Sequence, residues 1–244
     1  MKPAIITTNL TKKYDGKTAV DNLNLMVNQG ELYSLLGVNG AGKTTTIKML
    51  SCLIKPTSGD ANLCGCSVQK EALKVKEKIN VSPQETAIAM QLSVRENLEF
   101  ICGIYGHDKS SSKKKTTEVI ENLGLSEIEH SKARTLSGGW RRRLSIAMAL
   151  ISDPEILFLD EPTLGLDVIA RRELWQTIKS LKGRKTIILT THYLEEAESL
   201  SDHIGIMTKG RLVASGTPEE LKADAGEDRF EEAFVKLCEG GIGQ

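Results

Sequence analysis

The sequence predicts an α/β fold in which the strands of a buried, largely parallel sheet alternate with helices. Residues 31–36 form a short apolar run, and a glycine-rich turn and a helix-compatible segment follow it. Residues 156–159 and 186–189 are two further apolar runs, and each of them also precedes a helix-compatible segment. Such runs are typical of strands buried on both faces, and their alternation with helices is typical of a parallel sheet.

The first 92 residues are predicted to be rich in strands. Runs near 4–8, 19–27 and 59–66 either alternate apolar with polar residues or are rich in β-branched ones, so they add strands to the one at 31–36. Residues 44–53 are predicted to form a helix, which the Lys-Pro-Thr-Ser-Gly turn at 55–59 ends.

Helical periodicity then dominates residues 93–153. It is clear at 93–100 and 116–123, and the basic, serine-rich stretch at 109–115 between them is interpreted as a solvated loop. After residue 154 the sheet resumes and is predicted to close with a hairpin, 203–208 and 211–216, around Lys209-Gly210. Two short helices are expected after the hairpin, and the second carries the apolar residues Phe230, Phe234, Val235 and Leu237.

These patterns predict three parts. Residues 1–92 and 154–225 form the core, residues 93–153 form a helical subdomain inserted into it, and residues 226–244 form a C-terminal helical tail.

Composition limits the classes of function. The 244 residues are 40% hydrophobic and 26% charged, as in an ordinary globular protein, and 32 Lys and Arg balance 32 Asp and Glu. No overall field therefore draws the chain to nucleic acid or to an anionic bilayer. The sequence has no apolar stretch of spanning length and no signal-peptide core at its start, so a cytoplasmic location is expected. Its five cysteines are expected to be free thiols.

Residues 37–44, Gly-Val-Asn-Gly-Ala-Gly-Lys-Thr, predict a phosphate-binding loop. Its glycines allow successive backbone N–H groups to face one point, and the helix that follows adds its positive N-terminal end. Lys43 supplies a full charge to the terminal phosphates, and the Thr44 hydroxyl is a ligand for a bridging magnesium ion. The predicted nucleotide contacts of this loop are Gly37, Val38, Asn39, Gly40, Ala41, Gly42, Lys43, Thr44 and Thr45.

Asp160 and Glu161 follow the apolar run at 156–159 and place two carboxylates at the carboxyl end of a buried strand. Asp160 is predicted to meet the magnesium ion. Glu161 is predicted to orient or deprotonate the water that attacks the γ-phosphate. The alternative interpretation is an acidic pair that only caps the next helix.

Leu136-Ser137-Gly138-Gly139 precedes a second helix and forms a second predicted anion site. One triphosphate seldom needs two such sites in one chain. Together with the phosphate loop, this stretch resembles the signature motif of the ATP-binding cassette (ABC) family, the ATPases of ABC transporters. The resemblance covers nearly the whole chain and implies a P-loop NTPase core with an antiparallel β subdomain and an inserted α-helical subdomain.

The resemblance also assigns single residues, in the family's order. Tyr14 matches the aromatic that stacks on adenine, Asp167 the aspartate of the dimer contact, and His192 the switch histidine. Gln84 matches the glutamine between the sheet and the helical subdomain, which implies a catalytic role and contact with Mg²⁺. In the family, Ser137, Gly138 and Gly139 of one subunit close on ATP held by the other. The implied ligands are therefore ATP and Mg²⁺, and the implied partners are a second ATPase subunit, identical or related, and a separate transmembrane permease.

Two features set the chain apart from the usual pattern. Trp140 stands where the family usually has Gln, which leaves the backbone site of the signature intact. Arg141, Arg142, Arg143 and the C-terminal helix resemble the branch that energises two-subunit exporters of drugs, lipids, polysaccharides or ions.

A contact with the permease is expected between residues 84 and 105. Apolar residues there are candidates for the lining of a cleft, although plain packing within the subdomain is an equal alternative: Ile88, Met90, Leu92, Phe100 and Tyr105. The second function considered is a soluble ABC-type ATPase that acts in assembly or nucleic-acid remodelling without a membrane partner. A P-loop kinase is a third, but it gives no reason for residues 136–139.

Overall fold

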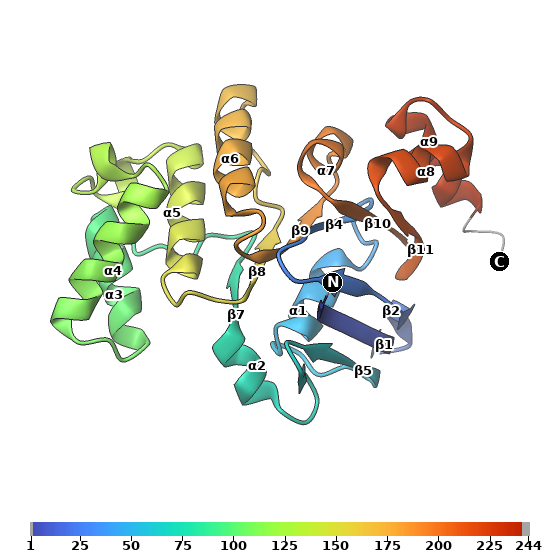
Figure 1. Cartoon of the computed structure of the whole chain (residues 1–244), viewed down its shortest axis with the longest axis horizontal. Coiled ribbons are helices and arrows are strands. Elements are labelled where there is room, and N and C mark those ends of the chain that lie inside the picture. The colour runs from blue at the N-terminus through green and yellow to red at the C-terminus, as the bar shows by residue number, and fades with distance from the viewer. Residues whose placement is uncertain (1, 241–244) are drawn as a thin grey trace.

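The computed structural model describes residues 2–240 and contains two sheets with helices around them (Figure 1). The larger sheet has six strands in the order β11-β10-β4-β9-β8-β7. These are β4 (Leu32–Leu36), β7 (Ile79–Ser82), β8 (Ile156–Asp160), β9 (Thr186–Thr191), β10 (His203–Thr208) and β11 (Arg211–Gly216). All neighbours are parallel except β10 and β11, which form the predicted hairpin. The predicted parallel core is confirmed, because every residue of β4, β8 and β9 is buried.

The smaller sheet is antiparallel and comes from the first 67 residues. It contains β1 (Pro3–Tyr14), β2 (Lys17–Leu23), β3 (Met26–Asn28), β5 (Ser58–Leu63) and β6 (Cys66–Ser67). Between the two sheets lies α1 (Lys43–Leu50), whose Ile47, Met49 and Leu50 belong to one core cluster with residues of both sheets. Helix α1 ends at Leu50, three residues before the predicted end, where Ser51 forms the C-cap.

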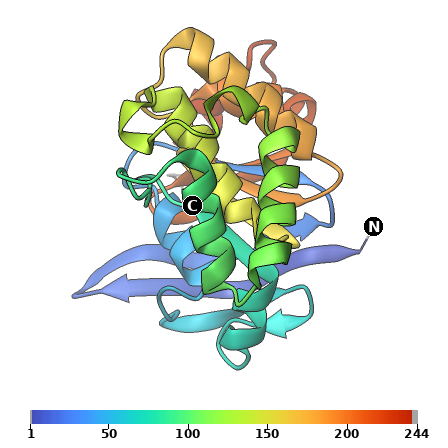
Figure 2. The ribbon, with the colours of Figure 1, turned by 90° about the vertical axis from the view of Figure 1, so that its left-hand side faces the viewer.

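A helical subdomain is inserted between β7 and β8. It contains α3 (Val94–Ile104), α4 (Lys109–Asn122), two 3₁₀ turns (Ser126–Ile128 and Ala133–Thr135) and α5 (Gly138–Leu150). Helices α3 and α4 lie side by side (Figure 2). Its core is continuous with the face of the large sheet formed by Leu157, Leu159 and Leu189.

The interpretation of residues 109–115 as a loop was wrong, because these residues form the first half of α4. Asp108 caps the helix and accepts hydrogen bonds from the backbone N–H groups of Ser110 (2.8 Å) and Ser111 (3.0 Å). The buried residues of α4 are Ser112, Thr116 and Ile120, spaced four apart. Two of these three are polar, so the buried stripe gives no hydrophobic periodicity in the sequence.

The remaining helices flank the large sheet. They are α2 (Ala72–Lys78), α6 (Val168–Leu181), α7 (Leu194–Leu200), α8 (Pro218–Ala225) and α9 (Phe230–Gly240). Helix α2 and strand β7 had no counterpart among the predicted elements. The two predicted C-terminal helices are α8 and α9, which pack together against β10 through a third cluster that includes Leu221 and Phe230. Residues 241–244 of the predicted tail lie outside the described residues.

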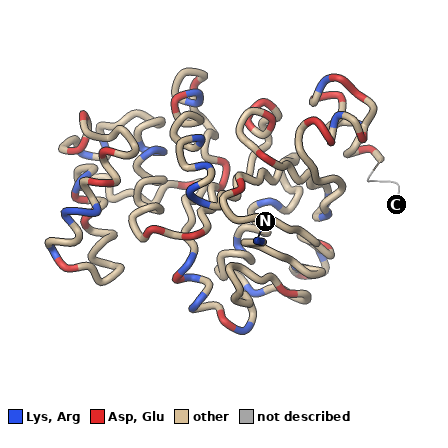
Figure 3. Tube along the Cα trace, viewed as in Figure 1, with Lys and Arg blue, Asp and Glu red and all other residues tan. Residues whose placement is uncertain are grey.

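Both signs of charge recur along the whole trace (Figure 3). The balance of 32 basic and 32 acidic residues therefore also holds locally, and no large part of the described chain carries one sign alone. Among the helices of residues 2–240, none is both long enough and apolar enough to cross a bilayer.

Candidate nucleotide site

A pocket of about 830 Å³ opens beside the glycine-rich loop, between the two sheets. That volume is within the usual range for sites that hold a small organic ligand. Its lining includes eleven of the predicted site residues: Tyr14, Asn39, Gly40, Ala41, Gly42, Lys43, Thr44, Thr45, Gln84, Glu161 and His192. Lys17 and Lys209 also line it and had not been predicted.

The loop runs from the end of β4 to the start of α1 and lies close to backbone on its other side. Gly42 has φ 104°, and a Cβ atom at this position would lie 2.6 Å from the Ala19 carbonyl oxygen. A Cβ atom on Gly37 would collide with the Met207 carbonyl. The two glycines are therefore required by the fold as well as by the ligand.

Lys43 is the first residue of α1 and is buried. Its ammonium group donates to the carbonyl oxygens of Gly37 (2.7 Å) and Val38 (3.3 Å) across the loop. These two predicted contacts are not among the residues that line the pocket. The same group is 3.2 Å from Oε1 of Glu161. The charge of Lys43 is thus held at the centre of the loop, where a phosphate would meet it.

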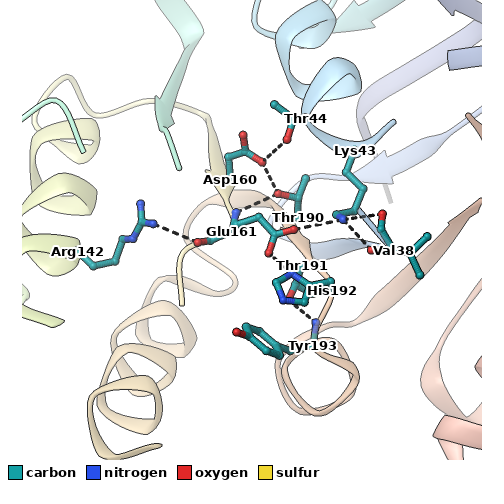
Figure 4. Close-up of polar contacts among 11 residues, drawn as sticks. Val38, Lys43, Thr44, Arg142, Asp160, Glu161, Thr190, Thr191, His192 and Tyr193 are labelled. Atoms are coloured by element: carbon teal, nitrogen blue, oxygen red, sulfur yellow. Dashed lines mark hydrogen bonds and ion pairs between the residues drawn. The ribbon is translucent and has the colours of Figure 1, made fainter. Parts of the chain in front are cut away.

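The acidic pair lies at the carboxyl end of β8, as predicted (Figure 4). Oδ1 of Asp160 accepts hydrogen bonds from the hydroxyls of Thr44 (3.1 Å) and Thr190 (2.6 Å). Glu161 has its other carboxylate oxygen, Oε2, 2.7 Å from Nδ1 of His192. Helix α6 is capped by Asp167 instead, so the alternative in which the acidic pair serves as a helix cap is wrong.

The oxygen donors next to the loop fit a magnesium ion. Thr44 and Asp160 offer a hydroxyl and a carboxylate side by side, and hard oxygen ligands of this kind, few in number, suit an ion that keeps waters and phosphate oxygens around it. Gln84 lines the same pocket. Within residues 2–240, no group of three or more His, Cys, Asp and Glu residues forms a metal cluster of its own.

The signature segment lies elsewhere in the chain. Ser137 caps α5 and accepts a hydrogen bond from the backbone N–H of Trp140 at 3.4 Å. Ser137 and Gly138 are exposed, and none of the three residues 137–139 lines the pocket beside the loop. The second predicted anion site is therefore separate from the first within one chain.

The Trp140 ring is half-buried against the core of the helical subdomain and against Arg143 of its own helix. The guanidinium of Arg143 lies 4.6 Å from the ring centroid, and the same group forms an ion pair of 2.8 Å with Glu173 of α6. Trp140 thus forms part of the contact between α5 and α6.

Sequence reasoning missed two buried ionisable residues beside the site. Arg142, named in the sequence only as part of an arginine triplet, is 5% exposed and donates hydrogen bonds to backbone carbonyls around the pocket. Glu196 of α7 is fully buried and accepts a hydrogen bond from the Trp175 indole at 3.0 Å. Burial raises the pKa of the Glu196 carboxyl, and the hydrogen bond from Trp175 partly opposes that. Hydropathy contains no signal for either residue, because both are buried in spite of their charge.

A second, smaller pocket of about 220 Å³ lies where β7, α3 and α5 meet. Of the five apolar residues considered for a cleft, Tyr105 lines this pocket, together with Ile101 and Ile104. Ile88 packs against the core of the helical subdomain, while Met90 and Phe100 are exposed and Leu92 is half-buried.

Comparison with known proteins agrees with this geometry. The family model described as "ABC transporter" matches residues 20–164. The chain is 41% identical over 239 residues to the daunorubicin resistance ATP-binding protein DrrA3 of Streptomyces coeruleorubidus, covering 98% of this chain and 75% of that protein. It is 42% identical over 214 residues to the Nod factor export ATP-binding protein I of Cupriavidus metallidurans, covering 87% and 71%.

Solved structures have the same fold. CbiO1 from Clostridium perfringens, part of the ABC transporter complex cbiONQ, superposes with a TM-score of 0.84 at 26% identity and covers 92% of each chain. The ATP-binding cassette MJ0796, solved as a dimer in a post-hydrolysis state with ADP and phosphate, superposes with a TM-score of 0.77 at 27% identity over 87% of this chain and 98% of that one. The predicted fold is confirmed. With the match of the family model over residues 20–164 and relatives near 40% identity along most of its length, this chain belongs to the ABC transporter family, as an ATP-binding subunit.

Proposed function

We propose that two copies of this chain, or one copy and a related subunit, close around two ATP molecules and drive export through a separate membrane subunit. As an ABC ATPase, the chain binds ATP and hydrolyses it to ADP and phosphate. Export is supported by relatives that are named for drug resistance and for Nod factor export. On this proposal the chain is held at the inner face of the cell membrane by its partner.

The proposed dimer is supported by the separation of the two predicted anion sites within one chain. Ser137 and Gly138 are exposed at the start of α5 and lie outside the pocket of their own chain. An exposed helix N-terminus with free N–H groups favours an anion, and the phosphates of ATP bound to a second copy are anions of the right kind. Asp167, exposed beside this surface at the start of α6, is then a residue of the dimer contact.

Within one pocket each predicted residue receives a role. Tyr14, 45% exposed at the rim, stacks on the adenine, and the loop amides with Lys43 hold the phosphates. Thr44, Asp160 and Gln84 would hold the magnesium ion, which would neutralise part of the phosphate charge.

Glu161 takes up the proton of the attacking water, and His192 keeps its carboxylate in place. On this proposal, ATP binding activates Glu161 as a base by drawing Lys43 away from it. Lys43 now lies 3.2 Å from Glu161, and a triphosphate competes with the carboxylate for that ammonium group. Once Lys43 turns to phosphate, Glu161 keeps its contact of 2.7 Å with His192 and becomes free to accept a proton.

The membrane subunit is proposed to dock at the pocket formed by β7, α3 and α5. Ile104 and Phe100 are exposed on α3 by 64% and 58%, and Tyr105 follows at its end. Exposed apolar residues of this size around a concave surface are typical of a site for a partner helix.

Co-purification from solubilised membranes tests the proposal. The tagged chain should bring down a multi-spanning membrane protein, and Ile104→Asp should remove that protein while basal ATPase activity remains. Leu53→Asp is the matched control, because Leu53 is 63% exposed on another part of the surface. A chain that brings down no membrane protein and stays out of the membrane fraction would instead favour the soluble ABC-type ATPase.

A further inference from the structure

We propose that Arg142 is a positioning residue that sets the backbone of Glu161 and of the Gln84 turn relative to helix α5. The inference rests on the proposed function, because it concerns how hydrolysis at this pocket follows the position of the helical subdomain. Arg142 is not itself among the residues that line the pocket, but it donates hydrogen bonds to the backbone carbonyls of Gln84 and Glu161, which are.

The guanidinium of Arg142 joins three separate segments. Its Nη1 donates to the carbonyl oxygen of Pro83 at 2.6 Å, and its Nη2 donates to those of Gln84 at 2.8 Å and Glu161 at 3.1 Å. Arg142 lies on α5, Pro83 and Gln84 follow β7, and Glu161 follows β8. One buried side chain therefore ties the helical subdomain to Gln84 and Glu161, and Figure 4 shows its bond to Glu161.

The backbone of Glu161 needs such support. Its φ is 49°, in the left-handed region that residues with a side chain seldom occupy unless neighbouring groups hold them there. The N–H of Glu161 donates to the carbonyl (3.1 Å) and hydroxyl (3.0 Å) of Thr190, while its carbonyl accepts from the Leu164 N–H (3.2 Å) and from Arg142. These bonds hold the peptide on both sides of the Cα atom, and so they aim the carboxylate between Lys43 and His192.

The other arginines of the triplet make different contacts. Arg143 pairs with Glu173 and covers Trp140, and Arg141 donates to the Arg134 carbonyl at 3.0 Å. Within the described chain, Arg142 is the member whose hydrogen bonds reach the nucleotide site. Its neighbours are therefore suitable controls on the same helix.

A planar guanidinium is suited to this role, whereas an ammonium group is not. The fork of N–H donors reaches carbonyls that point from different segments, but a lysine amine occupies a single point on a flexible stem. Burial lowers the pKa of the Arg142 guanidinium, while the charges of Asp160 and Glu196 oppose that, so its charge is balanced within the site.

The same helix begins with the signature segment. Because α5 carries Ser137 at its N-terminus and Arg142 one and a half turns later, a movement of α5 that seats Ser137 on the partner's nucleotide also moves the donors to Glu161. Through Arg142, the orientation of the Glu161 carboxylate therefore depends on the position of the helical subdomain.

The test is the steady-state ATPase activity of Arg142→Gln and Arg142→Lys in the purified chain. Both variants should lose about tenfold or more in kcat, because small displacements of a catalytic group have effects of this size, while KM for ATP stays within about twofold. Arg143→Gln should keep kcat within about twofold. If Arg142→Gln does not accumulate as folded protein, Arg142→Lys carries the test with the same expected loss.

A second measurement separates positioning from general damage. If Arg142 acts through Glu161, adding Arg142→Gln to Glu161→Gln should change the residual hydrolysis by less than about twofold. An equal fold-loss in both backgrounds would overturn the inference, as would wild-type kcat in Arg142→Lys or a loss that lies wholly in KM. A wild-type chain that fails to dimerise or to bring down a membrane protein would instead contradict the proposed function. The kcat ratios between the Arg142 variants and their parent chains would still test the role of Arg142.

Discussion

Glu161→Gln removes the carboxylate that lies between Lys43 and His192 and replaces it by an amide of the same size. The side chain is 8% exposed, and its two oxygens are 3.2 Å from the Lys43 ammonium and 2.7 Å from Nδ1 of His192. The substitution leaves Asp160 and Thr44 in place, so the predicted metal ligands are untouched. The variant therefore isolates the step that handles the attacking water.

The expected loss in kcat is about 100- to 10,000-fold, which is the usual contribution of a positioned general base. It corresponds to about 3 to 5 kcal/mol of transition-state stabilisation. ATP affinity should stay the same or rise, because Lys43 no longer has a carboxylate partner and its charge is fully available to phosphate.

Phosphate release at saturating ATP measures the loss in kcat, and size-exclusion chromatography with and without ATP and magnesium measures dimer formation. If hydrolysis is what reopens the dimer, Glu161→Gln should accumulate as an ATP-bound dimer. Adding Ser137→Arg should abolish this dimer, since bulk and positive charge at the exposed start of α5 would meet the partner's nucleotide site. ATP binding by each monomer should persist, because Ser137 is not part of its own pocket.

Three results would refute the reasoning. A Glu161→Gln chain that hydrolyses ATP at the wild-type rate would remove Glu161 from the role of base. A variant that binds ATP but stays monomeric over a wide concentration range, or a dimer unaffected by Ser137→Arg, would reject the cross-subunit site.

Three further predictions concern single side chains. Lys43→Ala should weaken ATP binding about 10- to 100-fold, because a charged hydrogen-bond partner is lost; isothermal titration measures it, and unchanged affinity would contradict the role of the loop. Trp140→Gln should keep ATPase activity within about twofold and lower the free energy of unfolding by about 1 kcal/mol or more, since packing on Arg143 and on the core of the helical subdomain is lost; a large fall in turnover with an intact circular dichroism spectrum would contradict this. Glu196 has a raised pKa in the folded chain, so between the unfolded pKa of about 4.3 and the folded pKa the folded state binds more protons than the unfolded one. The free energy of unfolding should therefore fall as pH rises through this window, by at most about 1.4 kcal/mol per pH unit. Glu196→Gln should flatten this part of the urea-unfolding pH profile, and an unchanged profile would show that Glu196 is ionised in the folded chain.

The features that were predicted correctly from the sequence are those that depend on a contiguous stretch of residues. The glycine-rich loop and the Asp160-Glu161 pair each follow an apolar run, so the rule that ligands collect at the carboxyl ends of parallel strands was enough to bring them together. Helix α4 was half missed because Ser112 and Thr116 form part of its buried stripe. Arg142 was also missed, because its partners lie 58 and 59 residues before it and 19 after it, and only the tertiary fold brings them together.

The charges of the pocket alone do not balance those of ATP. Three lysines and one glutamate line it, namely Lys17, Lys43, Lys209 and Glu161, which leaves a surplus of two positive charges against the roughly four negative charges of ATP. In the chain alone Lys43 is paired with Glu161, so this surplus comes from Lys17 and Lys209. The oxygen pair of Thr44 and Asp160 provides for a divalent cation, and the exposed N-terminus of a partner's α5 adds about half a charge. The two charges of a divalent cation and the surplus of two in the pocket match the triphosphate, so we expect each chain to bind ATP together with its cation and the partner's α5 to strengthen that binding in the proposed dimer.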